Sequence, residues 1–76
     1  MDIGKVVSDY LKHNGMTQAE FRRRSGDRIA RTTLSNAVTK RNYKPSPQNL
    51  EVIADVMGLS VDDLLRKAKE ASNESD

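Results

Sequence analysis

The sequence predicts an all-α protein, a compact five-helix domain, and three observations lead to this prediction. Apolar residues recur at intervals of three and four along most of the chain, which is the spacing of one helix face. Helix-starting patterns, in which Ser or Thr is followed three residues later by Glu or Asp, introduce two of these segments. No segment alternates apolar and polar residues with the period of two that is typical of a strand.

The chain is short enough to hold a single hydrophobic core. Its 76 residues include no cysteine, which excludes disulfides and thiolate metal sites as sources of stability. Packing between helices must therefore stabilise the fold. We expect one domain over residues 1–70 and a flexible polar tail over residues 71–76, where the sequence reads ASNESD.

The first two helices are predicted over residues 2–13 and 17–24. In the first, apolar side chains fall at i, i+3, i+4 and i+7, and Asn14-Gly15 then provides a left-handed stop. In the second, Thr17 is the expected N-cap and Glu20 completes a capping box. Met16 and Phe21 have the spacing of a hydrophobic staple across this helix start.

The third helix is predicted from about residue 30 to residue 40, after the turn Gly26-Asp27-Arg28. Its apolar anchors are Ile29, Leu34, Ala37 and Val38. Thr-Thr and Ser-Asn within it are poor helix formers, so this helix is not composed for intrinsic stability. Such a polar surface suits a helix that must contact the edges of bases.

Two further helices are predicted in the second half of the chain. Ser46 caps the fourth, Pro47 occupies its first position and Gly58 ends it. The fifth begins with the same start signals as the second, carried by Leu59, Ser60, Asp63 and Leu64. We expect it to become polar beyond Ala68.

Charge is distributed unevenly along the chain. Residues 1–46 carry ten Lys or Arg and four acids, a net charge of +6, whereas residues 47–76 carry three bases and seven acids, a net charge of −4. This asymmetry fits either a surface for a polyanion or ordinary surface scatter. A basic loop follows the third predicted helix and contains Lys40, Arg41 and Lys44.

The order of these elements carries a family resemblance. The segments MTQAEF and TTLSNAV, with a Gly between them, and the later NLEVIADVMGLSVDDLL resemble the lambda-repressor-like (Cro/XRE) family of helix-turn-helix domains. The resemblance covers residues 3–66 and implies a transcriptional regulator of bacterial or phage type, a repressor, that binds double-stranded DNA. It also implies that the third helix lies in the major groove and that a homodimer binds two half-sites about one helical turn apart.

The resemblance also implies roles for individual residues. Expected contacts to base edges come from Arg31, Thr32, Thr33, Ser35 and Asn36, whose side chains have the donors and acceptors that bases require. Expected contacts to phosphate come from Thr17, Gln18, Arg22, Arg28, Lys40, Arg41, Asn42 and Lys44. In this family the Gln at the position of Gln18 also braces the recognition helix.

Three features depart from the family pattern. Arg22 stands where a small residue is usual, and Ser25 stands where an apolar residue is usual. The turn before the third helix is also one residue longer. We expect the longer turn to bring Ile29 into the space that Ser25 leaves.

Other function classes find little support in the sequence. A lone His13 without cysteine makes no metal site, and no nucleophile–base pair, cofactor motif or small-molecule site is present, so we expect no enzyme and no cofactor. No apolar run could act as a signal peptide or membrane span, which favours a cytoplasmic protein. The alternative function is a protein-interaction module, such as an antitoxin or regulatory partner, that uses the acidic half. A dimer surface is expected at Met57, Leu59, Val61 and Leu65.

Overall fold

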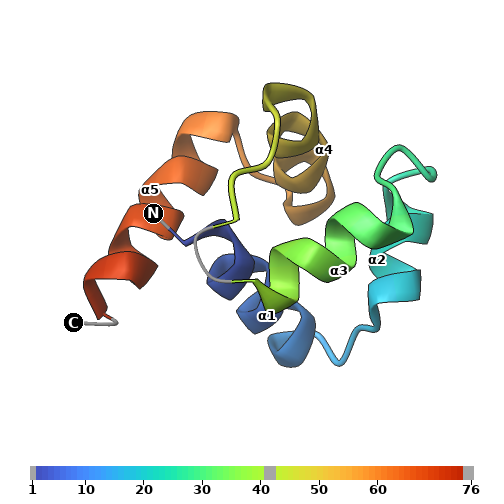
Figure 1. Cartoon of the computed structure of the whole chain (residues 1–76), viewed down its shortest axis with the longest axis horizontal. Coiled ribbons are helices and arrows are strands. Elements are labelled where there is room, and N and C mark those ends of the chain that lie inside the picture. The colour runs from blue at the N-terminus through green and yellow to red at the C-terminus, as the bar shows by residue number, and fades with distance from the viewer. Residues whose placement is uncertain (1, 41–42, 75–76) are drawn as a thin grey trace.

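Five helices make up the computed structural model, which describes residues 2–40 and 43–74, with side chains to residue 71. They are α1 (Ile3–His13), α2 (Gln18–Arg24), α3 (Arg31–Thr39), α4 (Pro47–Met57) and α5 (Val61–Glu74). Figure 1 shows α3 lying across α1, with α2 at one end of the molecule and α5 at the other. The described residues contain no strand, and the predicted all-α fold with five helices is confirmed.

Short polar side chains cap four of the helices at their N-terminal ends. The capping residues are Asp2, Thr17, Ser46 and Ser60, whose side-chain oxygens accept hydrogen bonds from the N–H groups of Lys5, Glu20, Asn49 and Asp63 at 3.0–3.2 Å. The predicted caps Thr17, Ser46 and Ser60 are thereby confirmed. The carboxylate of Glu20, expected to complete a capping box, lies 3.6 Å from the guanidinium of Arg24.

The core is formed where α1 meets the other helices. Phe21, Leu34, Ile53 and Leu64, one from each of the remaining helices, are fully buried in it. Gly4 lets α1 approach α3 closely, because a Cβ atom built on it would lie 1.9 Å from the carbonyl oxygen of Ala37. No side chain larger than hydrogen fits at this crossing without a shift of the backbone.

The C-terminal helix is longer than the sequence suggested. α5 continues to Glu74, so residues 71–74, which were expected to form a flexible tail, are helical, and residues 75–76 lie outside the described residues. The physical reason is that Ala71 is buried, one turn beyond the fully buried Ala68 and on the same helix face. The N–H of Asp2 donates to the carbonyl of Ala68 at 3.0 Å, which joins the start of α1 to this part of α5.

Candidate nucleic-acid interface

The turn between α2 and α3 has an unusual backbone. Gly26 and Asp27 are consecutive residues in the left-handed region, with φ values of 67° and 58°. The chain then brings Ile29 into the core, where it is fully buried, as expected for the longer turn. Ser25 is buried as well, and its hydroxyl donates to the carbonyl of Arg22 at 2.6 Å. Ile29 thus supplies apolar volume beside a serine whose hydroxyl is satisfied.

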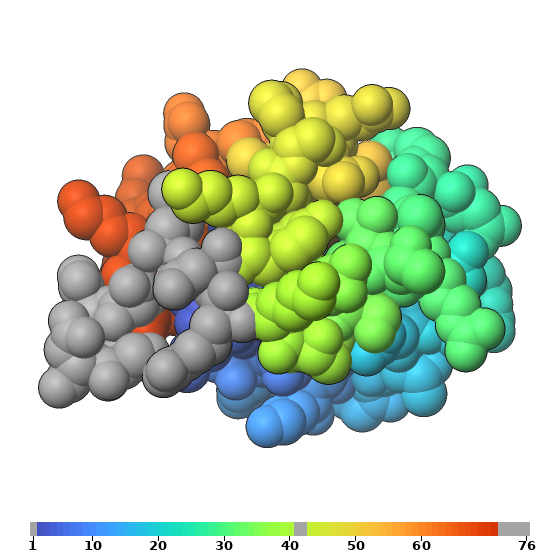
Figure 2. Space-filling model, in the orientation of Figure 1, coloured from blue at the N-terminus to red at the C-terminus, as the bar shows by residue number. Residues whose placement is uncertain are grey.

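Helix α3 has one buried face and one polar face. Leu34 and Ala37 point into the core and are fully buried. On the opposite face, helical spacing places Thr32, Ser35 and Asn36 together, with Arg31 at the exposed N-terminal end and Thr33 on a half-buried flank. Figure 2 shows α3 extending across the centre of one face of the molecule. The five predicted base-contact residues therefore all belong to this helix, and three of them share its outward face, where Thr32 is exposed and Ser35 and Asn36 are half-buried.

Thr39 belongs to the same face but is not among the contacts predicted from the sequence. It is exposed and lies seven residues after Thr32, a spacing of two helical turns that could have identified it. Its hydroxyl donates to the carbonyl of Ser35 at 2.7 Å, and the hydroxyl oxygen retains the capacity to accept a further hydrogen bond.

The N-terminal end of α2 lies close to the end of α3. Gln18, the first residue of α2, lines a shallow groove together with Leu11 of α1 and Val38 of α3. The exposed Thr17 precedes it, and the Thr17 hydroxyl is the cap of the helix. The structure therefore brings these two predicted phosphate-contact residues beside the polar helix.

The predicted basic loop continues directly from α3. Lys40, which follows the last residue of α3, and Lys44 are both exposed. Arg41 and Asn42 lie outside the described residues. In Figure 2, the yellow-green segment that follows the grey residues lies on the same face of the molecule as α3. Cationic side chains thus adjoin the polar face at the end opposite the turn.

Arg22 and Arg28 are placed differently from the other predicted phosphate contacts, because the protein itself provides partners for both. The Nε atom of Arg22 donates to the carbonyl of Ile29 at 3.2 Å, and its Nη2 atom lies 4.0 Å from the carboxylate of Asp27. The Nε atom of Arg28 donates to the carbonyl of Ser25 at 2.5 Å. Its Nη2 atom donates to the Asp55 carboxylate, also at 2.5 Å.

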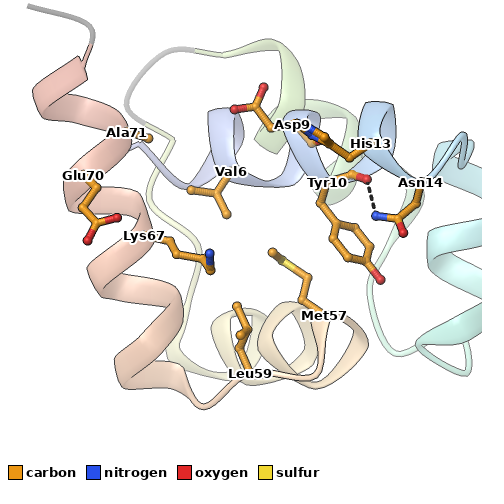
Figure 3. A pocket seen from close by; sticks show the side chains of 10 residues that line it. All are labelled: Val6, Asp9, Tyr10, His13, Asn14, Met57, Leu59, Lys67, Glu70 and Ala71. Carbon is orange, nitrogen blue, oxygen red and sulfur yellow. Dashed lines mark hydrogen bonds between the residues drawn. The ribbon is translucent and has the colours of Figure 1, made fainter.

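A separate groove of about 370 Å³ lies between α1 and the corner that joins α4 to α5. Figure 3 shows Val6, Met57 and Leu59 directed toward its centre, with the Tyr10 ring along one side. Charged and polar residues also line it, namely Asp9, His13, Asn14, Lys67 and Glu70. His13 is exposed, and its Nδ1 lies 2.8 Å from the carbonyl oxygen of Asp9.

Comparison with known proteins identifies the class of domain. A helix-turn-helix family model matches residues 7–64, which run from α1 into α5 and include the turn and all of α3. The chain belongs to this helix-turn-helix family, and its domain is lambda-repressor-like, with the fold of DNA-binding regulators. The curated proteins and the solved structures that were compared contain no match to the chain.

Within residues 2–40 and 43–74, no helix is long and apolar enough to cross a membrane. The same residues contain no group of three or more His, Asp or Glu side chains placed to bind a metal ion.

Proposed function

We propose that the protein is a sequence-specific regulator of transcription, a repressor, that binds double-stranded DNA with α3 in the major groove. The observation that supports this most is the division of α3 into two faces. Leu34 and Ala37 fix one face in the core, while short polar side chains occupy the other. A helix of this kind can enter the groove, and its Asn, Ser and Thr side chains can read base edges.

Phosphate contacts would hold the helix in register. Thr17 and Gln18 lie beside α3 on one side, and the segment from Lys40 to Lys44 follows its end. Within this segment, Arg41 and Asn42 are proposed from the sequence alone. Contacts of this type fix orientation and supply salt-dependent affinity, whereas base contacts supply specificity.

A single domain of this size covers few base pairs, so we further propose that two copies bind a pair of half-sites. The dimer surface would involve Met57, Leu59, Val61 and Leu65, all of which are half-buried in the single chain. A bacterial or phage regulator of this kind would act in the cytoplasm, where the DNA is.

The alternative is a protein-interaction module built on the same fold. The observation that favours it is the groove in Figure 3, because apolar side chains and charges of both signs line it. A module of this kind would bind another protein and would show no preference among DNA sequences.

Selection of bound duplexes from a random library tests the proposal. The wild-type protein should select a motif. The variant Asn36→Ala should lose preference at one base position, at a cost of about 1–3 kcal/mol. The variant Lys40→Ala should weaken binding to all duplexes alike and reduce the salt dependence. Lys69→Ala is the matched control, because Lys69 is exposed on α5.

Equal binding of the wild-type protein to every duplex would contradict base reading. A stable complex with another protein, formed without any such DNA preference, would support the alternative. Circular dichroism of each variant shows whether the fold is retained, so that loss of binding is not confused with unfolding.

A further inference from the structure

Arg28 joins the turn before α3 to a helix that is distant in the sequence. Its guanidinium donates to the carbonyl of Ser25 at the end of α2 and to the carboxylate of Asp55 in α4, in both cases at 2.5 Å. Asp55 comes 27 residues after Arg28. One side chain therefore links the end of α2, the turn and α4.

The start of α3 depends on such links because its own sequence provides few. Ala30 occupies the N-cap position and provides no side-chain hydrogen bond to the helix. The preceding Gly26 and Asp27 are both left-handed, a conformation that non-glycine residues adopt at a cost. Ile29 in the core and the hydrogen bond from Arg22 to the Ile29 carbonyl provide the other anchors. These anchors all hold the backbone directly before Arg31 and Thr32.

We propose that Arg28 and Asp55 are positioning residues, which set the orientation of α3 and thereby its base preference without contacting DNA. This inference rests on the proposed function and deepens it. It replaces the expectation that Arg28 binds phosphate, because a guanidinium paired with a carboxylate releases few counterions from DNA. Both side chains are more than half exposed, so their pairing contributes little to global stability. Orientation of the helix is the property that the pair controls.

The test compares Arg28→Gln, Asp55→Asn and the double variant with the wild-type protein. Affinity is measured for the selected duplex and for single-base variants of it, at several salt concentrations. Arg28→Gln and Asp55→Asn should each reduce the preference for the selected duplex about two- to fivefold, the range for ion pairs of this exposure. Their effects should not add in the double variant, and the slope of log affinity against log salt should stay unchanged.

A charge exchange makes the test sharper. The combined Arg28→Asp and Asp55→Arg protein should discriminate between duplexes better than either single reversal, because the pair is re-formed in the opposite sense. Arg66→Gln is the matched control. It removes an exposed arginine that lies 3.4 Å from Asp63 within α5 and should leave base preference unchanged.

Several results would overturn the inference. If Arg28→Gln lowers the salt slope by about 1 while Asp55→Asn leaves discrimination intact, Arg28 is a phosphate contact. Strictly additive effects in the exchanged protein, shown by circular dichroism to be folded, would also overturn it. A wild-type protein that selects no motif contradicts the proposed function itself, whereas an unchanged preference for the selected duplex in both Arg28→Gln and Asp55→Asn contradicts this inference alone.

Discussion

The helix-turn-helix region and the α4–α5 region of this protein are stabilised in different ways. Helices α4 and α5 begin at serine caps, and α4 ends at Gly58 in the left-handed conformation. Helix α3 begins at Ala30 without a side-chain cap and consists largely of Thr, Ser and Asn. The C-terminal helices therefore carry strong local signals, whereas α3 depends on its contacts with the rest of the protein. Because packing holds α3 in place, the helix proposed to read DNA can contain residues that favour DNA contact over helix stability.

The largest expected effect tests whether α3 depends on tertiary packing. Leu34→Ala should destabilise the protein by about 3–4 kcal/mol, because it removes a fully buried side chain and leaves a cavity. Leu64→Ala in α5 is the matched comparison and should cost a similar amount, since Leu64 is equally buried. Urea unfolding measures both values.

Hydrogen exchange distinguishes the two variants. Leu34→Ala should remove the protection of α3 amides before that of α5, because α3 has little local stability of its own. Uniform loss of protection in both helices would show that the two regions depend equally on packing, and it would contradict the proposed difference between them.

The second expected effect concerns the crossing of α1 and α3. Gly4→Ala should destabilise the protein by about 2 kcal/mol, because the new Cβ would meet the Ala37 carbonyl and force the helices apart. An alanine in place of glycine within an ordinary helix would stabilise instead, by about 0.5–1 kcal/mol. The sign of the change in thermal unfolding therefore decides the prediction. Ser8→Ala, at a half-buried position of the same helix, is the control and should change stability little.

The smallest expected effect compares two glycines with the same backbone conformation. Gly26 in the turn and Gly58 at the end of α4 have φ values of 67° and 71°, and neither has an atom within contact of an added Cβ. Gly26→Ala and Gly58→Ala should each cost about 1–2 kcal/mol from the left-handed backbone alone. Only Gly26→Ala should alter base preference, because only this turn leads into α3. An equal change of preference in both variants would contradict the assigned role of the turn.

Much of the fold could be predicted because its signals are local. Thr17, Ser46 and Ser60 were predicted as caps from residues within a few positions, and the structure confirms each of them. The outward face of α3 could also be predicted in large part, because helical spacing separates it from Leu34 and Ala37. Thr39 follows from the same spacing and was missed because the expected contacts ended at Asn36.

Local sequence was sufficient to predict the helix starts at Thr17, Ser46 and Ser60, because each depends on a hydrogen bond between residues three positions apart. Features that depend on residues distant in the sequence became visible only in the folded chain. Ala71 lies in a polar stretch of sequence, but it is buried because α5 packs on the core. Nothing in the sequence distinguishes Gly4, but α3 crosses α1 at this residue. Arg28 has the charge expected of a phosphate contact, and only the fold brings Asp55 to it from 27 residues away. The reason is that local sequence fixes backbone conformation within one helical turn, whereas the partner of an exposed charge is set by how the helices pack.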